Sequence, residues 1–401
     1  MVDILMIAYS CEPYSSSEGA VGWELASRIA RRHHVTLLTR PKARADIEEL
    51  RSANPDMDLE VEYHELGVLR RAKQFGLPVS NLRYLVWNHR LASRVEQLER
   101  TGRFDVVHHT TWVRHWMPSA AAGARALPFV WGPVGAAERT PLGLLRTMGW
   151  RALGGEMMRL LGPGVLRLDP MMRRTLNRVD FAVASSRDTG RLLERKGINH
   201  TLGPSVGFDP AVIPRAAPPN NEIVSVGRLL AWKGFHLGLQ AFARLEDRDL
   251  RYAIIGEGPE LSRWELLARR LGVADRVEFT GRLSREATLL RIGGSRLLVH
   301  PSFHDSGGFV VVEAMAQGVP VLTLDIGGPS FLSEPGGWAV PSRPTGNITD
   351  RLTEAMAGLL AEDGARSEMA QRHAAESLAW ERIVDVYDRI YQRLAGDGDG
   401  L

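Results

Sequence analysis

Short apolar runs recur along the whole chain, and segments with helical periodicity separate them. In the first half, strands are predicted at residues 4–9, 35–39, 104–109, 129–132 and 181–184. In the second half, they are predicted at residues 223–227, 252–256, 277–280, 297–300 and 319–324. Because strands that alternate with helices pair in parallel, this order predicts an α/β fold built of βαβ units. Ligands of such sheets gather at the carboxyl ends of the strands, so a site is expected in the loops that follow them.

Two domains are expected, because 401 residues exceed the size of one typical hydrophobic core. A Pro/Gly-rich stretch at residues 203–219 is typical of a linker. The first domain is therefore predicted to span residues 1–203 and the second residues 204–379. An amphipathic helix is predicted at about Ile383–Leu394, and residues 396–401 are predicted to form a disordered tail.

The composition is that of a soluble globular protein, with 44% hydrophobic and 24% charged residues. No run approaches the roughly 18 apolar residues of a membrane span. The first residues lack a basic leader and favour a buried strand over a signal peptide. The single cysteine, Cys11, has no partner for an internal disulfide. Together these features predict a cytoplasmic location.

The charge is distributed unevenly along the chain. Residues 1–200 hold 29 Lys and Arg against 21 Asp and Glu, whereas the rest holds 21 against 26. A basic first half suggests an anionic partner there, either a lipid surface at the inner membrane face or a phosphorylated acceptor. A solvated surface in an arginine-rich chain is the alternative. Residues 140–178, rich in Met and Arg, would form either a membrane-surface helix or a packed helix pair. No nucleic-acid partner is expected.

The segment from Asp305 to Glu313 places two carboxylates eight positions apart, around Gly307-Gly308 and an apolar run. This pattern predicts a loop that leads into a helix, whose first backbone N–H groups attract anions. The amides suit a phosphate and the carboxylates suit hydroxyl groups, so a nucleotide sugar is a candidate ligand. Taken alone, the same residues could be a turn, a helix cap and a solvated glutamate.

The turn after the strand at residues 223–227 carries two cations, Arg228 and Lys233, behind Gly227. Arginine offers a planar fork and lysine a point charge, and both could bind one diphosphate. A capped loop with solvated charges is the alternative. A second glycine turn follows at Gly256-Glu257-Gly258, and another strand ends at Gly281. These turns lack the third glycine of the dinucleotide-binding pattern.

Four motifs in order carry a family resemblance over about residues 221–335. They are Gly-Arg-Leu…Trp-Lys-Gly, Gly-Glu-Gly-Pro-Glu, Phe-Thr-Gly-Arg-Leu, and His-Pro-Ser-Phe…Gly-Gly-Phe…Glu-Ala-Met-Ala. This order resembles the retaining glycosyltransferases of family 4, which have the GT-B fold. The resemblance implies two Rossmann-like domains that face a central cleft, with the acceptor on the first and the donor on the second. The motif at residues 378–383 resembles the start of a helix that crosses back, so residues 380–395 would complete the first domain.

The resemblance also implies roles for single residues. Glu313 would bind the ribose, and Asp305, which stands where the family has a first glutamate, would contact the hydroxyls of the donor sugar. Arg228 and Lys233 would bind the diphosphate. The residues expected at the donor are Gly19, Gly227, Arg228, Lys233, Glu257, Gly258, Gly281, Gly308, Phe309, Val310 and Glu313.

The first half resembles the family more loosely. Its glycine-rich loop after the first strand corresponds to residues 15–20, with Gly19 opening a helix. The family places a histidine at the end of a later strand, near the anomeric carbon. His109 is the candidate, and His108 and Thr110 are alternatives. Two further residues, Glu18 and Glu138, are expected at the cleft or the acceptor.

The implied reaction moves a sugar from a nucleotide-diphosphate donor to an acceptor hydroxyl of a glycan, a lipid or a small molecule, with retention of configuration. His109, Arg228, Lys233 and Asp305 are the expected catalytic residues, and no metal or other cofactor is expected. Two alternatives stay open. The first is a nucleotide-sugar epimerase or a pseudo-glycosyl coupling enzyme on the same fold, and the second is a non-catalytic nucleotide-sugar-binding protein.

Overall fold

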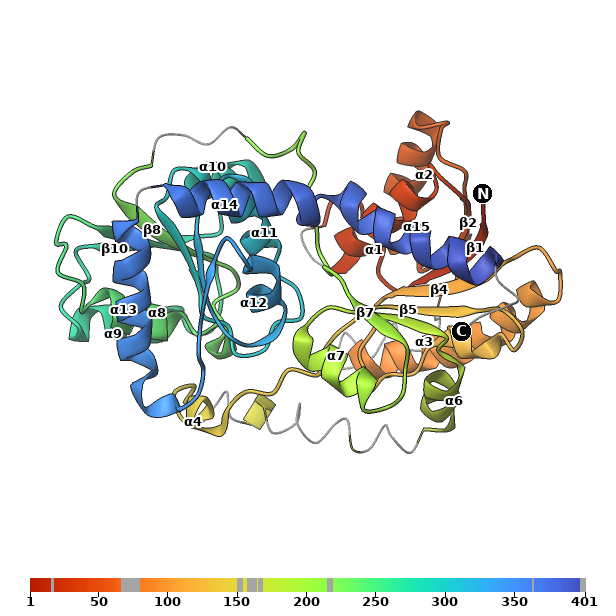
Figure 1. The fold of residues 1–401 in the computed structure, drawn as a ribbon, viewed down its shortest axis with the longest axis horizontal. Coiled ribbons are helices and arrows are strands. Elements are labelled where there is room, and N and C mark those ends of the chain that lie inside the picture. Colours follow the sequence, from red (N-terminus) through yellow and green to blue (C-terminus); the bar gives the residue numbers. More distant parts are fainter. Residues whose placement is uncertain are drawn as a thin grey trace.

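The chain forms two β-sheets whose strand pairs are all parallel, each sheet flanked by helices (Figure 1). The computed structural model describes residues 1–15, 18–65, 80–149, 154–156, 164, 169–214, 219–362 and 364–396. Within them, the first sheet has the order β3-β2-β1-β4-β5-β6-β7 and the second the order β10-β9-β8-β11-β12-β13. The α/β prediction is therefore confirmed.

The first sheet is built from strands that the sequence largely predicts. Its strands are β1 Asp3–Ala8, β2 His34–Thr39, β3 Leu59–Tyr63, β4 Val106–Thr111, β5 Phe129–Val134, β6 Phe181–Ala184 and β7 His200–Leu202. The accompanying helices are α1 Glu18–Ile29, α2 Arg44–Ala53, α3 Ser80–Glu99, α4 Leu142–Leu145, α6 Pro170–Arg178 and α7 Arg187–Glu194. Both β3 and β7 lie at sheet edges and were not predicted, because edge strands carry only a weak apolar signal.

The second sheet follows the predicted strands closely, apart from the unpredicted edge strand β13. Its strands are β8 Glu222–Val226, β9 Arg251–Ile255, β10 Val277–Gly281, β11 Leu297–His300, β12 Val321–Leu324 and β13 Trp338–Val340. Its helices are α8 Phe235–Phe242, α9 Leu261–Arg270, α10 Arg285–Gly293, α11 Phe309–Ala316, α12 Gly327–Ser333, α13 Ile348–Ala361 and α14 Ala365–His373.

The last helix, α15 Trp380–Gly396, crosses from the second domain to the first and packs beside α1 (Figure 1). Its apolar face is buried at Ile383, Tyr387 and Tyr391, and burying such side chains stabilises the contact by about 1.5–3 kcal/mol each. Its polar face pairs with the first domain, where Arg28 Nη1 lies 2.6 Å from Glu381 Oε1. The predicted return of the chain to the first domain is confirmed.

One segment does not stay with its own sheet. After β5 the chain reaches over to the second domain, where Leu144, Leu145 and Met148 join the same buried apolar cluster as Phe235 and Trp264. In Figure 1, α4 accordingly lies beside the second domain. These residues, which the prediction assigns to the first domain, therefore pack with the second domain.

Several sequence predictions fall wholly or partly outside the described residues. Gly396 ends α15 and is helical, whereas the rest of the predicted disordered tail, residues 397–401, lies outside them. Most of residues 150–168, in the predicted Met- and Arg-rich helices, also lie outside them. Among the helices that are described, none is both long enough and apolar enough to cross a membrane.

Candidate active site

The turns after β8 and β11 lie against each other because a glycine lets their backbones approach. Gly234 has a φ of +73°, and a Cβ there would lie 2.1 Å from the carbonyl oxygen of Pro301. Phe303 N donates to the carbonyl oxygen of Trp232 at 2.8 Å. Since β8 and β11 are neighbours in the sheet, this close contact brings Lys233 to Asp305.

Lys233 and Asp305 form an ion pair in which Nζ lies 2.5 Å from Oδ2. His300, at the end of β11, donates its Nε2–H to the same carboxylate oxygen at 3.3 Å. Burial would raise the pKa of Asp305, but the Lys233 charge and the His300 hydrogen bond outweigh it and hold the pKa well below its usual value. Burial and the nearby ammonium also lower the pKa of His300. The site therefore presents an ionised carboxylate between a cation and a neutral imidazole.

Three glycine turns are stacked at the carboxyl ends of β8, β9 and β10. A Cβ on Gly256 would lie 2.0 Å from the Gly227 carbonyl oxygen, and one on Gly258 would lie 2.4 Å from that of Leu229. Gly256 N donates to the Gly281 carbonyl oxygen at 2.9 Å. Three of the predicted donor glycines, Gly227, Gly258 and Gly281, thus lie in turns that contact one another. Glu257 and Arg228 lie at the exposed side of these turns, and Arg228 makes no ion pair with any described residue.

Helix α11 begins four residues after Asp305 of the Lys233–Asp305 ion pair. Val311 N and Val312 N donate to the Gly308 carbonyl oxygen, so the N–H groups of Phe309 and Val310 belong to the first turn, which has no partners within the helix. This terminus suits an anion.

Glu313 follows on the same helix and is only 4% exposed. Its carboxylate pairs with Arg285 Nη2 at 2.9 Å. Burial raises the pKa of Glu313, and the Arg285 charge opposes that rise. Two carboxylates, three basic side chains and a helix terminus thus lie on or next to one set of turns, which suits a ligand with both phosphate and hydroxyl groups.

The histidines of β4 lie deeper than expected. The predicted strand end at His109 is wrong, because β4 continues to Thr111. A bulge in β4 lies opposite Ile7 and Ala8 of β1, where the pairing register shifts. His108 donates from Nε2 to the Gly132 carbonyl oxygen at 2.9 Å and accepts from the Tyr391 hydroxyl at 2.5 Å. It is therefore a core residue that joins β4 to α15.

His109 faces the other side of the sheet and is also fully buried. Its Nδ1 is hydrogen-bonded to Ser119 Oγ at 2.7 Å, and its ring stacks on Tyr84. Thr110 occupies the bulge, and its hydroxyl donates to the Ile7 carbonyl oxygen. A catalytic contact by His109 stays a prediction that this burial does not favour.

The loop after β1 is tightly packed against the start of α1. A Cβ on Gly19 would lie 1.9 Å from Glu12 Oε2, so a larger residue there would require the Glu12 side chain to move. Glu18 accepts a hydrogen bond from Trp112 N, and burial raises the pKa of its carboxyl. Glu18 therefore joins the loop after β1 to the loop after β4.

Glu138 is hydrogen-bonded to residues of both domains. Its carboxylate accepts from Ser186 Oγ of the first domain at 2.8 Å and from Ser306 Oγ of the second at 3.1 Å. Ser306 also accepts from Ala136 N at 2.9 Å. Since Ser306 follows Asp305 in the chain, this bridge fixes the end of β5 beside the candidate donor site.

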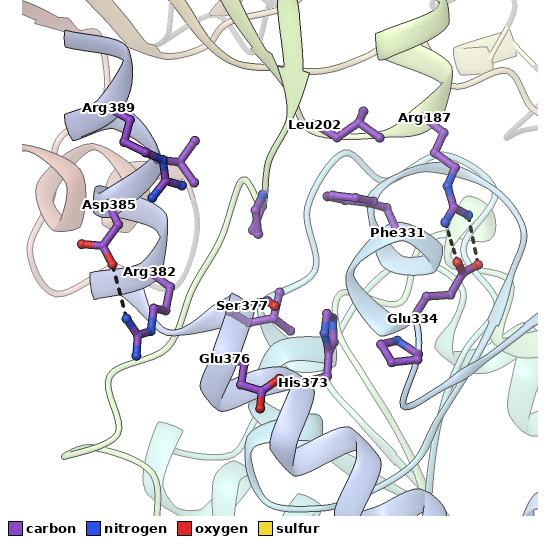
Figure 2. Close-up of a pocket in the computed structure, with 14 residues that line it drawn as sticks. Arg187, Leu202, Phe331, Glu334, His373, Glu376, Ser377, Arg382, Asp385 and Arg389 are labelled. Atoms are coloured by element: carbon purple, nitrogen blue, oxygen red, sulfur yellow. Dashed lines mark hydrogen bonds and ion pairs between the residues drawn. The ribbon is translucent and has the colours of Figure 1, made fainter. Parts of the chain in front are cut away.

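The pocket in Figure 2 lies apart from these residues. It has a volume of about 750 Å³ and is lined by the β7 end, the α12 end and the α14–α15 crossover. Arg187 and Glu334 pair at its edge, and none of the predicted donor residues lines it. The donor site is therefore assigned from the motif residues and their contacts rather than from this pocket.

Three partners of the site were missed by sequence reasoning. His300 stands in the quoted His-Pro-Ser-Phe motif, and its position at a strand end could have indicated it. Arg285 and Ser306 carry no local signal, because their partners Glu313 and Glu138 are distant in the sequence or on another domain.

Two family models match the chain in tandem. Residues 19–202 match the model described as "Glycosyl transferase 4-like domain", and residues 213–375 match "Glycosyl transferases group 1". The chain is a glycosyltransferase with the GT-B fold. In this enzyme, the match to the 4-like domain ends at β7. The match to the group 1 family contains every predicted donor residue except Gly19.

Known proteins are similar over much of the enzyme. It is 28% identical to a 2-deoxystreptamine glucosyltransferase of Streptomyces kanamyceticus, over 78% of this chain and 73% of that protein. It is 27% identical to a D-inositol 3-phosphate glycosyltransferase of Mycobacterium marinum, over 76% of this chain and 66% of that protein. The crystal structure of HepE from Anabaena in complex with UDP has a TM-score of 0.63, 16% identity, and coverage of 98% of this chain and 100% of HepE.

Proposed function

We propose that the enzyme transfers a sugar from a nucleotide-diphosphate donor to an acceptor hydroxyl, with retention of the anomeric configuration. The observation that carries the proposal is the meeting of Lys233, Asp305 and His300 beside the α11 terminus. Charged groups of both signs at one helix start suit a diphosphate joined to a polyol.

The chemistry assigned to these residues is stabilisation of the leaving group. As the bond between the anomeric carbon and the diphosphate oxygen breaks, negative charge grows on the diphosphate. In this proposal, Arg228, Lys233 and the first amides of α11 bind that charge. The acceptor oxygen forms the new bond to the anomeric carbon, and its proton passes to the departing phosphate, so no protein base is needed. We further propose that no metal takes part.

Lys233 and Asp305 are paired with each other in the structure. In the proposed complex, Lys233 leaves Asp305 for the diphosphate, and Asp305, still held by His300, accepts hydrogen bonds from the sugar hydroxyls. Interactions that strengthen as the diphosphate departs raise the rate, whereas uniform binding does not.

The acceptor is proposed to bind the first domain, across the bridge that Glu138 and Ser306 form. The two relatives are named for small polyhydroxylated acceptors, which favours a small molecule or a glycoside precursor over a polymer. Contact of the basic first half with a membrane face, and a cytoplasmic location, stay predictions.

A donor screen tests the proposal. The enzyme is incubated with UDP-, GDP-, TDP- and ADP-sugars, beginning with UDP-glucose because HepE was solved with UDP, and the thermal unfolding midpoint is measured. A donor that binds the native state raises the midpoint by mass action. Nucleoside diphosphate release is then measured with and without acceptor. Release that depends on acceptor, with retained product configuration by NMR, supports transfer, whereas sugar isomerisation without release indicates the epimerase alternative.

A further inference from the structure

An aromatic cluster lies at the carboxyl edge of the first sheet. The ring of Tyr9 packs edge-on against Tyr84 at 5.2 Å, Trp87 at 5.3 Å and Trp112 at 5.0 Å between centroids. Trp112 has a φ of +61°, which is uncommon for a non-glycine residue and is typical of functional sites. Its indole Nε1 donates to Ser10 Oγ at 3.0 Å, which ties the loop after β4 to the loop after β1.

Two arginines contact rings of this cluster, and a third is next to one of its residues in the sequence. The guanidinium of Arg40, after β2, lies 3.8 Å from the centre of the Tyr9 ring. That of Arg114, after β4, lies 4.9 Å from the Trp112 ring and donates to Asn81 Oδ1 at 3.3 Å. Arg83 stands in the first turn of α3, next to Tyr84. The guanidinium groups of Arg40 and Arg114 thus lie on rings of this cluster, and Arg83 stands beside it in the chain.

Arg83 is the member whose bonding is incomplete. Its Nε is buried and has no hydrogen-bond partner among the described residues. A buried donor without a partner is costly, and more so when it carries charge. An oxyanion that binds at this place would satisfy it.

The local charge balance also favours an anion. Burial lowers the pKa of Arg40, and the positive charge of Arg83 adds to that effect, so the two cations act on the same space. The acidic groups nearby are Glu12, which lies 3.1 Å from Lys42 and 3.5 Å from Arg40, and Glu18. Four basic side chains therefore face two carboxylates.

The cluster lies on the side of the first sheet that meets the second domain. It follows β1, β2 and β4, and the neighbouring strand β5 ends at the bridge between Ala136 and Ser306. An acceptor held here would therefore face the turns that carry Asp305.

We propose that Arg83 and Arg40 bind an anionic group, a phosphate or a carboxylate, on the acceptor, and that the half-buried Trp112 ring packs against the acceptor body. This inference rests on the proposed function and deepens it by naming the acceptor class. It predicts that the enzyme discriminates against cationic acceptors.

Binding to the UDP-saturated enzyme tests the inference by isothermal titration calorimetry. UDP fills the donor site, so that added anions report on the first domain. The probes are D-inositol 3-phosphate, myo-inositol, 2-deoxystreptamine and inorganic phosphate. The wild type is expected to bind D-inositol 3-phosphate at least tenfold more tightly than myo-inositol and to bind 2-deoxystreptamine most weakly.

Variants then assign the preference to Arg83. Arg83→Gln is expected to remove the tenfold preference, and Arg83→Lys to keep part of it, because a lysine retains the charge without the fork. Arg90→Gln, an exposed position on the same helix, is the matched control and should match the wild type. Thermal unfolding confirms that each variant is folded.

The outcomes separate the two proposals. If UDP binds but no anionic probe binds more tightly than myo-inositol, or if Arg83→Gln keeps the preference, the acceptor inference is overturned and the donor proposal stands. If neither UDP nor any other nucleoside diphosphate binds, the proposed function fails, whereas phosphate binding that depends on Arg83 would still uphold an anion site.

Discussion

The Lys233 ammonium and the Asp305 carboxylate meet at 2.5 Å, although they follow two different strands of the second sheet. The contact depends on Gly234, which lets the two turns touch, and on His300, which binds the same oxygen. Two turns that are distant in the sequence are therefore held together at the candidate site by an ion pair and a close backbone contact.

Replacing Lys233 with methionine should lower kcat/KM by roughly 100-fold or more, because one cation at the leaving group is lost. Asp305→Asn should lower activity and relax the choice of donor sugar, since the amide cannot accept from hydroxyls as a carboxylate does. Steady-state kinetics with the donor found by screening would measure both effects. Arg270→Met, at an exposed position of α9, is the control. A wild-type rate in Lys233→Met would disprove the assignment.

Glu313→Gln should raise the KM for the donor by about tenfold, because a charged hydrogen bond contributes about 1.5–3 kcal/mol. The exposed Glu286 on neighbouring α10 gives a matched control in Glu286→Gln. Donor titration by calorimetry would separate weaker binding from slower chemistry. Equal donor affinity in both variants would place Glu313 outside the donor site.

Gly135→Ala should slow the reaction by disturbing the contact between the two domains. A Cβ at Gly135 would lie 2.6 Å from Ser306 Oγ, so the ends of β5 and β11 would have to separate. Gly154→Ala is the matched control, because a Cβ there meets nothing within 4 Å. The measurement is kcat at saturating donor together with the thermal midpoint. A loss of stability equal in both variants, without a specific loss of kcat in Gly135→Ala, would contradict the expectation.

The enzyme should lose stability as the pH falls from about 6.5 towards 4. Burial lowers the pKa of His108 to about 4 and those of His109 and His236 to about 3, against an ordinary value of 6.5. In that window the unfolded chain binds protons that the folded chain does not, so the free energy of unfolding decreases with falling pH.

Thermal unfolding at pH 7 and pH 5 measures this dependence. His236→Gln should show a smaller drop than the wild type, because one buried titrating group is removed while a polar partner for Thr147 remains. The exposed His89→Gln serves as the control. An unchanged pH dependence in His236→Gln would show that this histidine does not contribute to the drop.

Local sequence features predicted much of the second domain. The strand at Leu297–His300 was predicted at its observed bounds, and the glycine turns after β8 and β9 were placed correctly. These features depend on apolar runs and on glycine, whose effects act over a few residues. The end of β4 was predicted wrongly, because its bulge arises from pairing with β1, about a hundred residues earlier.

The sequence by itself determined the α/β class, the parallel sheets and the turns where a diphosphate could bind, because periodicity and glycine act locally. Only the tertiary structure decided which side chains meet. It paired Glu313 with Arg285, placed Ser306 on Glu138 of the other domain, and buried His108 against Tyr391. Such contacts follow from the order of strands in a sheet and from the path of α15, and neither is specified by the residues that lie next to each other along the chain.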